Sequence, residues 1–183
     1  MFNQPASILL TGASQLESRA MRSRNFLFRR DTEIVPKNPG MEARFSRPTK
    51  DDQLVRSTYT HLESSDSCID CDINGVVARP TRQSKDPQVH YGTIASRNRV
   101  MKDASERVKI AENFNEFSFE MEAAGIMNHL PCIVIRGICE YCDSHKSKDW
   151  QGYAALAAAI YAQMLLKRVL VNKSQIRRKR MEF

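Results

Sequence analysis

The chain has 183 residues, of which 42% are hydrophobic and 27% are charged; this balance indicates one globular domain and excludes a disordered chain. No apolar run approaches the roughly 18 residues of a membrane span, and the start lacks the basic region of a signal peptide. We therefore expect no membrane, a cytoplasmic or nuclear location, and five cysteines that are reduced thiols rather than disulfides.

The net charge of +7 comes largely from two basic stretches, 19–30 and 173–180. Residues 5–22 are predicted to form a helix with a partial apolar face. Arg22 to Arg30 interleaves basic and aromatic residues, a pattern that nucleic-acid-binding proteins use. No stacking motif follows it, so we favour a solvated helix end and expect no nucleic acid partner.

Residues 31–87 contain five prolines and show little hydrophobic periodicity, which indicates an irregular insert. The alternatives within it are two short strands, at 54–59 and at 75–78. The sequence contains two cysteine pairs, Cys68 with Cys71 and Cys139 with Cys142. Two such pairs are the ligand set of a four-thiolate zinc site, which is one interpretation of them. Their separation is far longer than the roughly 15–20 residues of a zinc ribbon. Ordinary thiols are therefore the favoured interpretation, and we expect no metal.

The second half of the chain alternates between the two-residue period of strands and the period of helices. Strands are predicted near 88–96, 116–121 and 132–138, and helices near 100–113, 121–129 and 150–170. This order predicts an α/β fold. The basic tail 173–183 is expected to be a solvated, disordered end, although Arg177 to Arg180 also resembles a weak nuclear-import signal.

Four acidic residues lie where two predicted strands end. Glu120 and Glu122 flank Met121 after the second strand, and Glu140 and Asp143 follow the third. Ligands of α/β sheets bind at the carboxyl ends of strands. We therefore predict that Glu122 and Glu140 point into one cleft that takes a polyhydroxyl or base-bearing ligand; the alternative is that all four are capping and surface acids.

Five motifs together resemble the nucleoside phosphorylase superfamily, in particular the branch found at the amino-terminal end of fungal multidomain proteins. The motifs are Val89–Ser96 (VHYGTIAS), Val100–Asp103 (VMKD), Phe119–Gly125 (FEMEAAG), Arg136–Asp143 (RGICEYCD) and Trp150–Ala155 (WQGYAA). The resemblance implies a partial three-layer α/β/α sandwich over residues 1–172 that lacks the first strands of the family. It extends to about Leu166 and is carried by the motifs in combination.

The resemblance also implies a purine nucleoside as ligand and roles for six residues. Glu120, Met121 and Glu122 would bind the ribose, Val100 and Met101 would contact the base, and Glu140 would be the catalytic acid facing the purine. No cofactor is implied, and phosphate would be a co-substrate. Acids near the sugar also suit the positive charge that develops on ribose when an N-glycosidic bond breaks.

Several positions depart from the family pattern. Glu140 stands where the family has Asp, Val100 where some members have a stacking aromatic, and Arg97 where the family has a turn glycine. The seven glycines form no glycine-rich loop, so the sequence offers no phosphate cradle of that type, and we expect weak or absent turnover. A sheet without its first strands would have an unpaired edge strand, and such an edge favours association of two copies, so a homo-oligomer is one of the expected alternatives.

Two functions from different classes follow from these observations. One is an enzyme, or a remnant of one, that cleaves purine nucleosides. The other is a non-catalytic nucleoside-sensing or interaction module built on the same fold.

Overall fold

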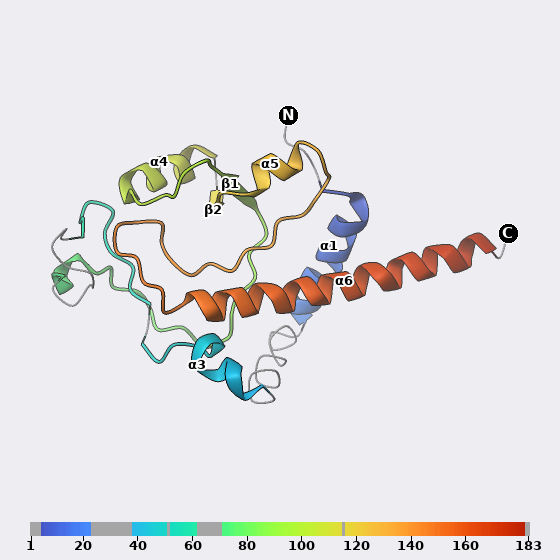
Figure 1. The fold of residues 1–183 in the computed structure, drawn as a ribbon, viewed down its shortest axis with the longest axis horizontal. Helices are drawn as coiled ribbons and strands as arrows, with labels where there is room; N and C mark the ends of the chain where they lie inside the picture. The colour runs from blue at the N-terminus through green and yellow to red at the C-terminus, as the bar shows by residue number, and fades with distance from the viewer. Residues whose placement is uncertain (1–4, 23–37, 51, 62–70, 115, 182–183) are drawn as a thin grey trace.

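A computed structural model describes residues 5–22, 38–50, 52–61, 71–114 and 116–181. The predicted basic stretch 23–30 and Cys68 lie outside these ranges. In chain order the elements are α1 Ser7–Arg22, η1 Pro39–Met41, α3 Glu42–Phe45, η3 Ile73–Gly75, β1 Thr93–Ser96, α4 Ala104–Phe114, β2 Glu116–Glu120, α5 Ala123–Met127 and α6 Gln151–Met181 (Figure 1).

The two strands β1 and β2 form a small parallel sheet, and α4 is the crossover between them. The ladder pairs Ala95 with Phe119 and Ser96 with Glu120, so both strands end at the same level. Ala95 and Phe119 are buried with Met101 in a small core that Ile110 of α4 covers. This strand, helix and strand unit confirms the predicted α/β class, although β1 is shorter than the predicted 88–96 strand.

The predicted third strand, 132–138, is wrong. The segment is described throughout but joins no ladder, and the sheet has two strands, β1 and β2. Ile133 and Ile135 pack instead on the cluster between α1 and α6. A Cβ atom built on Gly137 would lie 2.0 Å from the carbonyl oxygen of Ala154 in α6. The apolar run is therefore half-buried by helix packing rather than by sheet formation.

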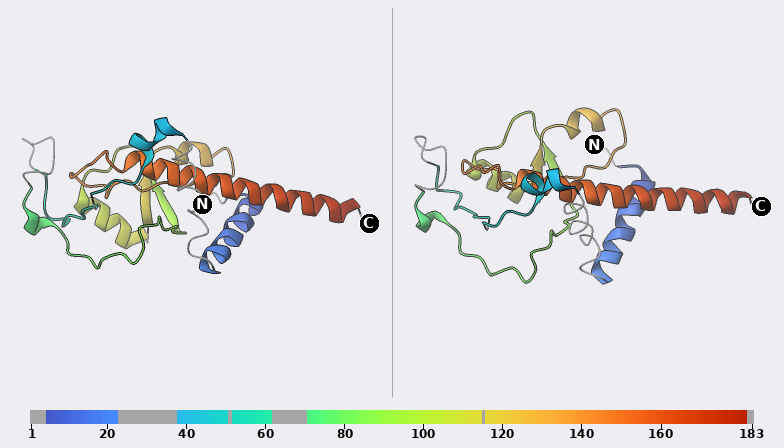
Figure 2. Two further views of the ribbon diagram at one scale, coloured as in Figure 1. Left: turned by 90° about the horizontal axis from the view of Figure 1, so that it is seen from below. Right: turned by 60° about the horizontal axis from the view of Figure 1, so that its bottom comes forward.

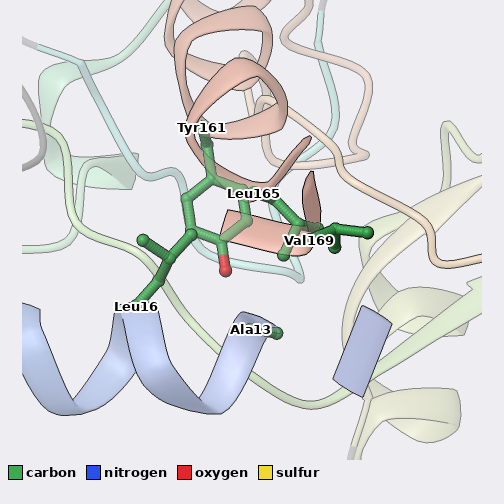
Figure 3. Packing of buried hydrophobic residues seen from close by; sticks show 5 residues of the cluster. All are labelled: Ala13, Leu16, Tyr161, Leu165 and Val169. Atoms are coloured by element: carbon green, nitrogen blue, oxygen red, sulfur yellow. The ribbon is translucent and has the colours of Figure 1, made fainter. Parts of the chain in front are cut away.

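The main core lies where α1 crosses α6 (Figure 3). Ala13 and Leu16 of α1 face Tyr161, Leu165 and Val169 of α6, and all five side chains are buried. These α6 positions follow the helical spacing that the sequence predicted. Burying five such side chains is the main apolar contribution that holds the two helices together.

The helix α6 is longer than predicted and continues to Met181. The prediction of a disordered tail is therefore wrong for residues 173–181, which are helical. Figures 1 and 2 show its last turns projecting away from the rest of the fold. Within the described residues, 151–174 of α6 are long and apolar enough, by length and composition alone, to cross a membrane. A third of that stretch (33%) is buried inside the fold, and soluble core helices meet the same criterion.

The described parts of 31–87 contain only short elements. They hold η1, α3 and η3, and a single antiparallel bridge joins Val55 to Val76 where short strands were predicted. Arg79 donates to the backbone oxygen of Asp52 at 2.7 Å and to the Tyr141 hydroxyl at 2.6 Å, and that hydroxyl donates to the Asp52 carboxylate. These contacts fix the insert to the loop that carries Glu140.

Candidate functional site

The candidate site begins at the carboxyl ends of β1 and β2. Ser96 and Glu120 are ladder partners at the last position of each strand, and the Arg97 N–H donates to the Glu120 carbonyl at 3.0 Å. The chain passes from β2 through Met121 and Glu122 into the short helix α5. Parallel pairing therefore brings Ser96 and the Glu120–Glu122 segment to one edge of the sheet.

Glu120 is buried, with 4% of the residue exposed. Its Oε2 atom accepts hydrogen bonds from the N–H groups of Glu122 at 2.8 Å and Ala123 at 2.7 Å. Ser96 holds the next residue, because its hydroxyl oxygen accepts the Ala124 N–H at 3.0 Å. Glu120 thus determines the path of the backbone through the predicted ribose-binding residues.

The second carboxylate oxygen of Glu120, Oε1, is buried and makes no hydrogen bond of ordinary geometry to a described residue, although the Ser96 hydroxyl is close enough to lower the pKa of this carboxyl group. Such an atom normally pairs with a protein group, a water or a ligand, because leaving it unpaired costs about 1–3 kcal/mol. No pattern in the sequence distinguishes the two carboxylate oxygens.

The pKa of Glu120 is below its ordinary value. Burial acts in the opposite direction, but the Ser96 hydroxyl, the two backbone N–H groups and the charge of Arg136 together outweigh it. A depressed pKa favours the carboxylate at neutral pH, so Glu120 is an acceptor of hydrogen bonds rather than a proton donor. The Glu120 carboxylate therefore stabilises the fold fully at pH values above its pKa in the unfolded chain. This stabilisation is lost as the pH falls through the lower pKa of Glu120 in the folded protein.

Met121 and Glu122 are exposed beside this buried carboxylate. The Met121 residue is 44% accessible, and Glu122 turns one oxygen, Oε2, to accept the Met121 N–H at 3.1 Å. Its other oxygen makes no hydrogen bond or ion pair with a described residue. An apolar and an acidic side chain next to a buried carboxylate can hold a ribose by its face and its hydroxyl groups.

Glu140 lies in the loop 139–146 and forms an ion pair with Lys146, whose Nζ donates at 2.6 Å. No hydrogen bond or ion pair in the described ranges joins Glu140 to Glu122. Arg136 connects the two regions electrostatically, because its charge acts on Glu120 and also on the thiols of Cys139 and Cys142 near Glu140. The shared cleft for Glu122 and Glu140 stays a prediction.

The two predicted base-binding residues differ in exposure. Val100 is 48% exposed and precedes α4, so it can offer an apolar surface to a base. Met101 is only 5% exposed and packs with Ala95 and Phe119, so its side chain is a core group and not a binding surface. Arg97 has no positive φ, so the strain that a glycine position would impose on it is absent; its guanidinium pairs with Glu106 at 2.5 Å.

Asp143 has a structural position. It is 5% exposed, accepts the His145 N–H at 2.9 Å through Oδ1, and has Oδ2 at 3.9 Å from the Arg107 guanidinium of α4. His145 stacks on Tyr59 of the insert with ring centroids 5.5 Å apart. Sequence analysis missed this cluster, because its members are spread along the chain from Tyr59 to His145 and share no motif.

The cysteines give no metal centre in the described ranges, where no group of three or more metal-ligating side chains occurs. Cys71, Cys132, Cys139 and Cys142 are free and partly buried. Burial, and then the charge of Glu140, raises the pKa of the Cys139 and Cys142 thiols. A raised pKa makes both thiols less reactive at neutral pH.

Comparison with known proteins gives one informative relative. No family model matches the sequence, and no solved structure matches it. The chain is 42% identical over 168 residues to a nucleotide-binding leucine-rich repeat (NLR)-like protein of Hyaloscypha variabilis. The match covers 90% of this chain but only 16% of that protein, so the chain is similar to one part of a much longer polypeptide.

Proposed function

We propose that this chain is a nucleoside phosphorylase-like domain that binds purine nucleosides at the carboxyl ends of β1 and β2. The observation that carries the proposal is the exposed Met121–Glu122 pair at the end of β2, whose backbone is held in place by buried Glu120. The five sequence motifs support the same assignment. The proposed fold is the α/β/α sandwich of that family, of which the βαβ unit would form part.

Ribose suits this arrangement chemically. Its vicinal hydroxyls can donate to the exposed Glu122 carboxylate, while the Met121 side chain packs on the apolar face of the sugar. Hydrogen bonds to an ionised acceptor are worth about 1.5–3 kcal/mol, more than bonds between neutral groups. An accessible carboxylate at Glu122 therefore makes the sugar, rather than the base, the main expected source of affinity.

Turnover is expected to be slow for reasons that the site itself provides. The proposed acid, Glu140, is held as an acceptor by Lys146 at 2.6 Å and forms no hydrogen bond or ion pair with the ribose-binding residues in the described ranges. Glu has one more methylene than the family Asp, and a misplacement of about 1 Å can cost roughly 100-fold in rate. The sequence also has no glycine-rich loop that would hold the attacking phosphate.

We therefore expect release of adenine from adenosine, or hypoxanthine from inosine, at well below about 1 s⁻¹, with or without phosphate. The measurement is chromatographic detection of the free base after incubation with the purified chain. Glu140→Asp should not raise the rate to this level, because a shorter acid does not supply a binding site for the nucleophile. Release at about 1 s⁻¹ or faster by the native chain would show that the site is a competent enzyme.

The second candidate function is a nucleoside-sensing or interaction module without catalysis. The similarity to one part of an NLR-like protein supports it, because such a part can serve a larger protein by binding alone. Nucleoside binding that changes association with other proteins, without release of base, would favour this candidate. Release of base that depends on Glu140 would favour the enzyme.

A further inference from the structure

Two parts of the molecule that are far apart in the sequence meet at the imidazole ring of His145. The insert supplies Tyr59, whose ring stacks on His145 with the centroids 5.5 Å apart, and His61, whose ring meets it edge-on at 5.3 Å. The His61 N–H also donates to the Ser144 hydroxyl oxygen at 2.9 Å. These four residues, called the His145 clasp below, fasten the insert to the loop 139–146.

Each side of the clasp is positioned by its own segment. A Cβ atom built on Gly75 would lie 3.0 Å from Cδ1 of Tyr59, so the tyrosine ring lies against the backbone of η3. The Tyr59 hydroxyl accepts the Asp72 N–H at 2.9 Å. In the loop, the His145 N–H donates to Oδ1 of Asp143 at 2.9 Å. The contact between the two rings therefore joins two segments that are each already ordered.

The buried ring of His145 is poorly placed to carry a positive charge. Its Nε2 atom is buried and makes no hydrogen bond to a described residue. Its Nδ1 atom is 3.5 Å from the Ser144 hydroxyl oxygen, which already accepts the His61 N–H. An imidazolium carries a proton on both nitrogens. Protonation would therefore create a charged Nε2–H group in a buried position without an acceptor, which costs free energy.

The neighbouring charges do not remove this cost. Asp143 favours a charged His145, but its Oδ2 atom is 3.9 Å from the Arg107 guanidinium of α4. Burial keeps the pKa of His145 below its ordinary value; the charge of Asp143 opposes this effect, and the charge of His61 adds to it. Among the described residues, the titratable groups at the ring and the charged groups next to them are Tyr59, His61, Asp143, Arg107, Lys146 and Glu140.

We propose that the His145 clasp opens when the ring of His145 takes up a second proton, so that acid loosens the insert from the loop 139–146. The open clasp exposes the ring and restores the ordinary pKa of histidine, about 6.5. Because the pKa in the closed clasp is lower, the open form binds more protons as the pH falls. The stabilisation by the clasp is therefore complete above the pKa of the open form and is lost as the pH falls through the pKa of the closed form.

A second set of contacts limits the opening. Arg79, Tyr141 and Asp52 join the insert to the same loop without a histidine. Burial acts to raise the pKa of Asp52, but the hydrogen bonds from Tyr141 and Arg79 outweigh it and lower that pKa. These contacts should therefore persist at a pH at which His145 is protonated. The expected change is a local separation of residues 59–61 from residues 144–145, and not release of the whole insert.

The test is amide hydrogen exchange of the His61 N–H, followed by NMR in the native chain between about pH 7.5 and about pH 5, with rates corrected for intrinsic exchange at each pH. The opening constant should rise at least about threefold over this range, since each unit of difference in pKa is a tenfold change in the equilibrium. The Val77 N–H donates to the Leu54 carbonyl at 2.8 Å within the insert and should show constant protection.

Two variants assign the effect to His145. His145→Phe keeps an aromatic ring beside Tyr59 but takes up no proton, so its His61 opening constant should not change with pH. His129→Phe alters an exposed histidine and should behave as the native chain does. A pH-independent opening constant in the native chain, or a pH dependence that persists in His145→Phe, would overturn the proposal.

A titration of the native chain keeps the test decisive if His145→Phe does not fold. The ring protons of His145 should titrate in NMR spectra with a lower midpoint in the folded chain than in the urea-unfolded chain. An equal or higher midpoint in the folded chain would overturn the proposal. No nucleoside enters these measurements, so their outcome is independent of the nucleoside proposal.

Discussion

Replacing Gly137 by alanine should lower the free energy of unfolding by about 3 kcal/mol, near the upper end of measured overpacking costs. The added Cβ would lie 2.0 Å from the carbonyl oxygen and 2.4 Å from the carbonyl carbon of Ala154. Both are backbone atoms of α6, so no side chain can rotate to make room. The segment 132–138 or the helix must move, and either movement loosens the packing of Ile133 and Ile135 on the core.

Gly125→Ala is the matched control for this change. A Cβ atom at Gly125 meets nothing within 4 Å, and the residue lies within α5, where alanine is favoured over glycine by up to about 1 kcal/mol. Urea unfolding followed by circular dichroism should therefore show a lower midpoint for Gly137→Ala and an equal or higher one for Gly125→Ala. Equal midpoints for the native chain and Gly137→Ala would contradict the contact between the 132–138 segment and α6.

Leu165→Ala should also destabilise the fold by about 3 kcal/mol, because it leaves a cavity where α1 meets α6. Leu165 is 2% exposed and belongs to the buried cluster with Leu16 of α1 and its α6 neighbours Tyr161 and Val169 (Figure 3). Its Cδ1 atom is also 3.0 Å from the position of a Cβ on Gly12, which shows how closely the two helices approach there. Truncation removes contacts to both helices together.

Leu166→Ala provides the comparison within the same helix. Leu166 is 60% exposed, so the same chemical change should alter the free energy of unfolding by no more than about 0.5 kcal/mol. The pair shares its helix propensity, and the difference between the two variants therefore measures burial alone. If both leucines tolerate alanine equally, α1 does not pack on α6 through Leu165.

The sequence predicted the helices of the second half and the βαβ unit well, because each has a clear hydrophobic period. It was wrong for 132–138, where a run of β-branched residues is equally suited to a central strand or to a segment pressed between helices. Only the backbone approach at Gly137 separates the two outcomes, and no local pattern encodes it. The helical tail to Met181 was missed because a basic run was interpreted from its charge rather than as a continuation of α6.

The candidate site could be predicted in position but not in detail. The spacing of Glu120, Met121 and Glu122 at a strand end placed them at one edge of the sheet. The sequence could not distinguish buried Glu120, which directs the backbone, from exposed Glu122. The pairing of Glu140 with Lys146 depends on the path of the loop 139–146, which no sequence pattern indicates.

The most direct measurement of the central claim is titration of the chain with adenosine and with 2′,3′-dideoxyadenosine, in the native form, in Glu122→Gln and in Glu112→Gln. Glu112 is exposed on α4 and provides the same change of charge away from the site. We predict a Kd for adenosine of about 1 mM or tighter, weakened at least about tenfold by loss of the hydroxyls or by Glu122→Gln, and unchanged in Glu112→Gln. Equal binding of the two nucleosides, or no binding of adenosine by the native chain, would contradict a ribose site at Glu120–Glu122.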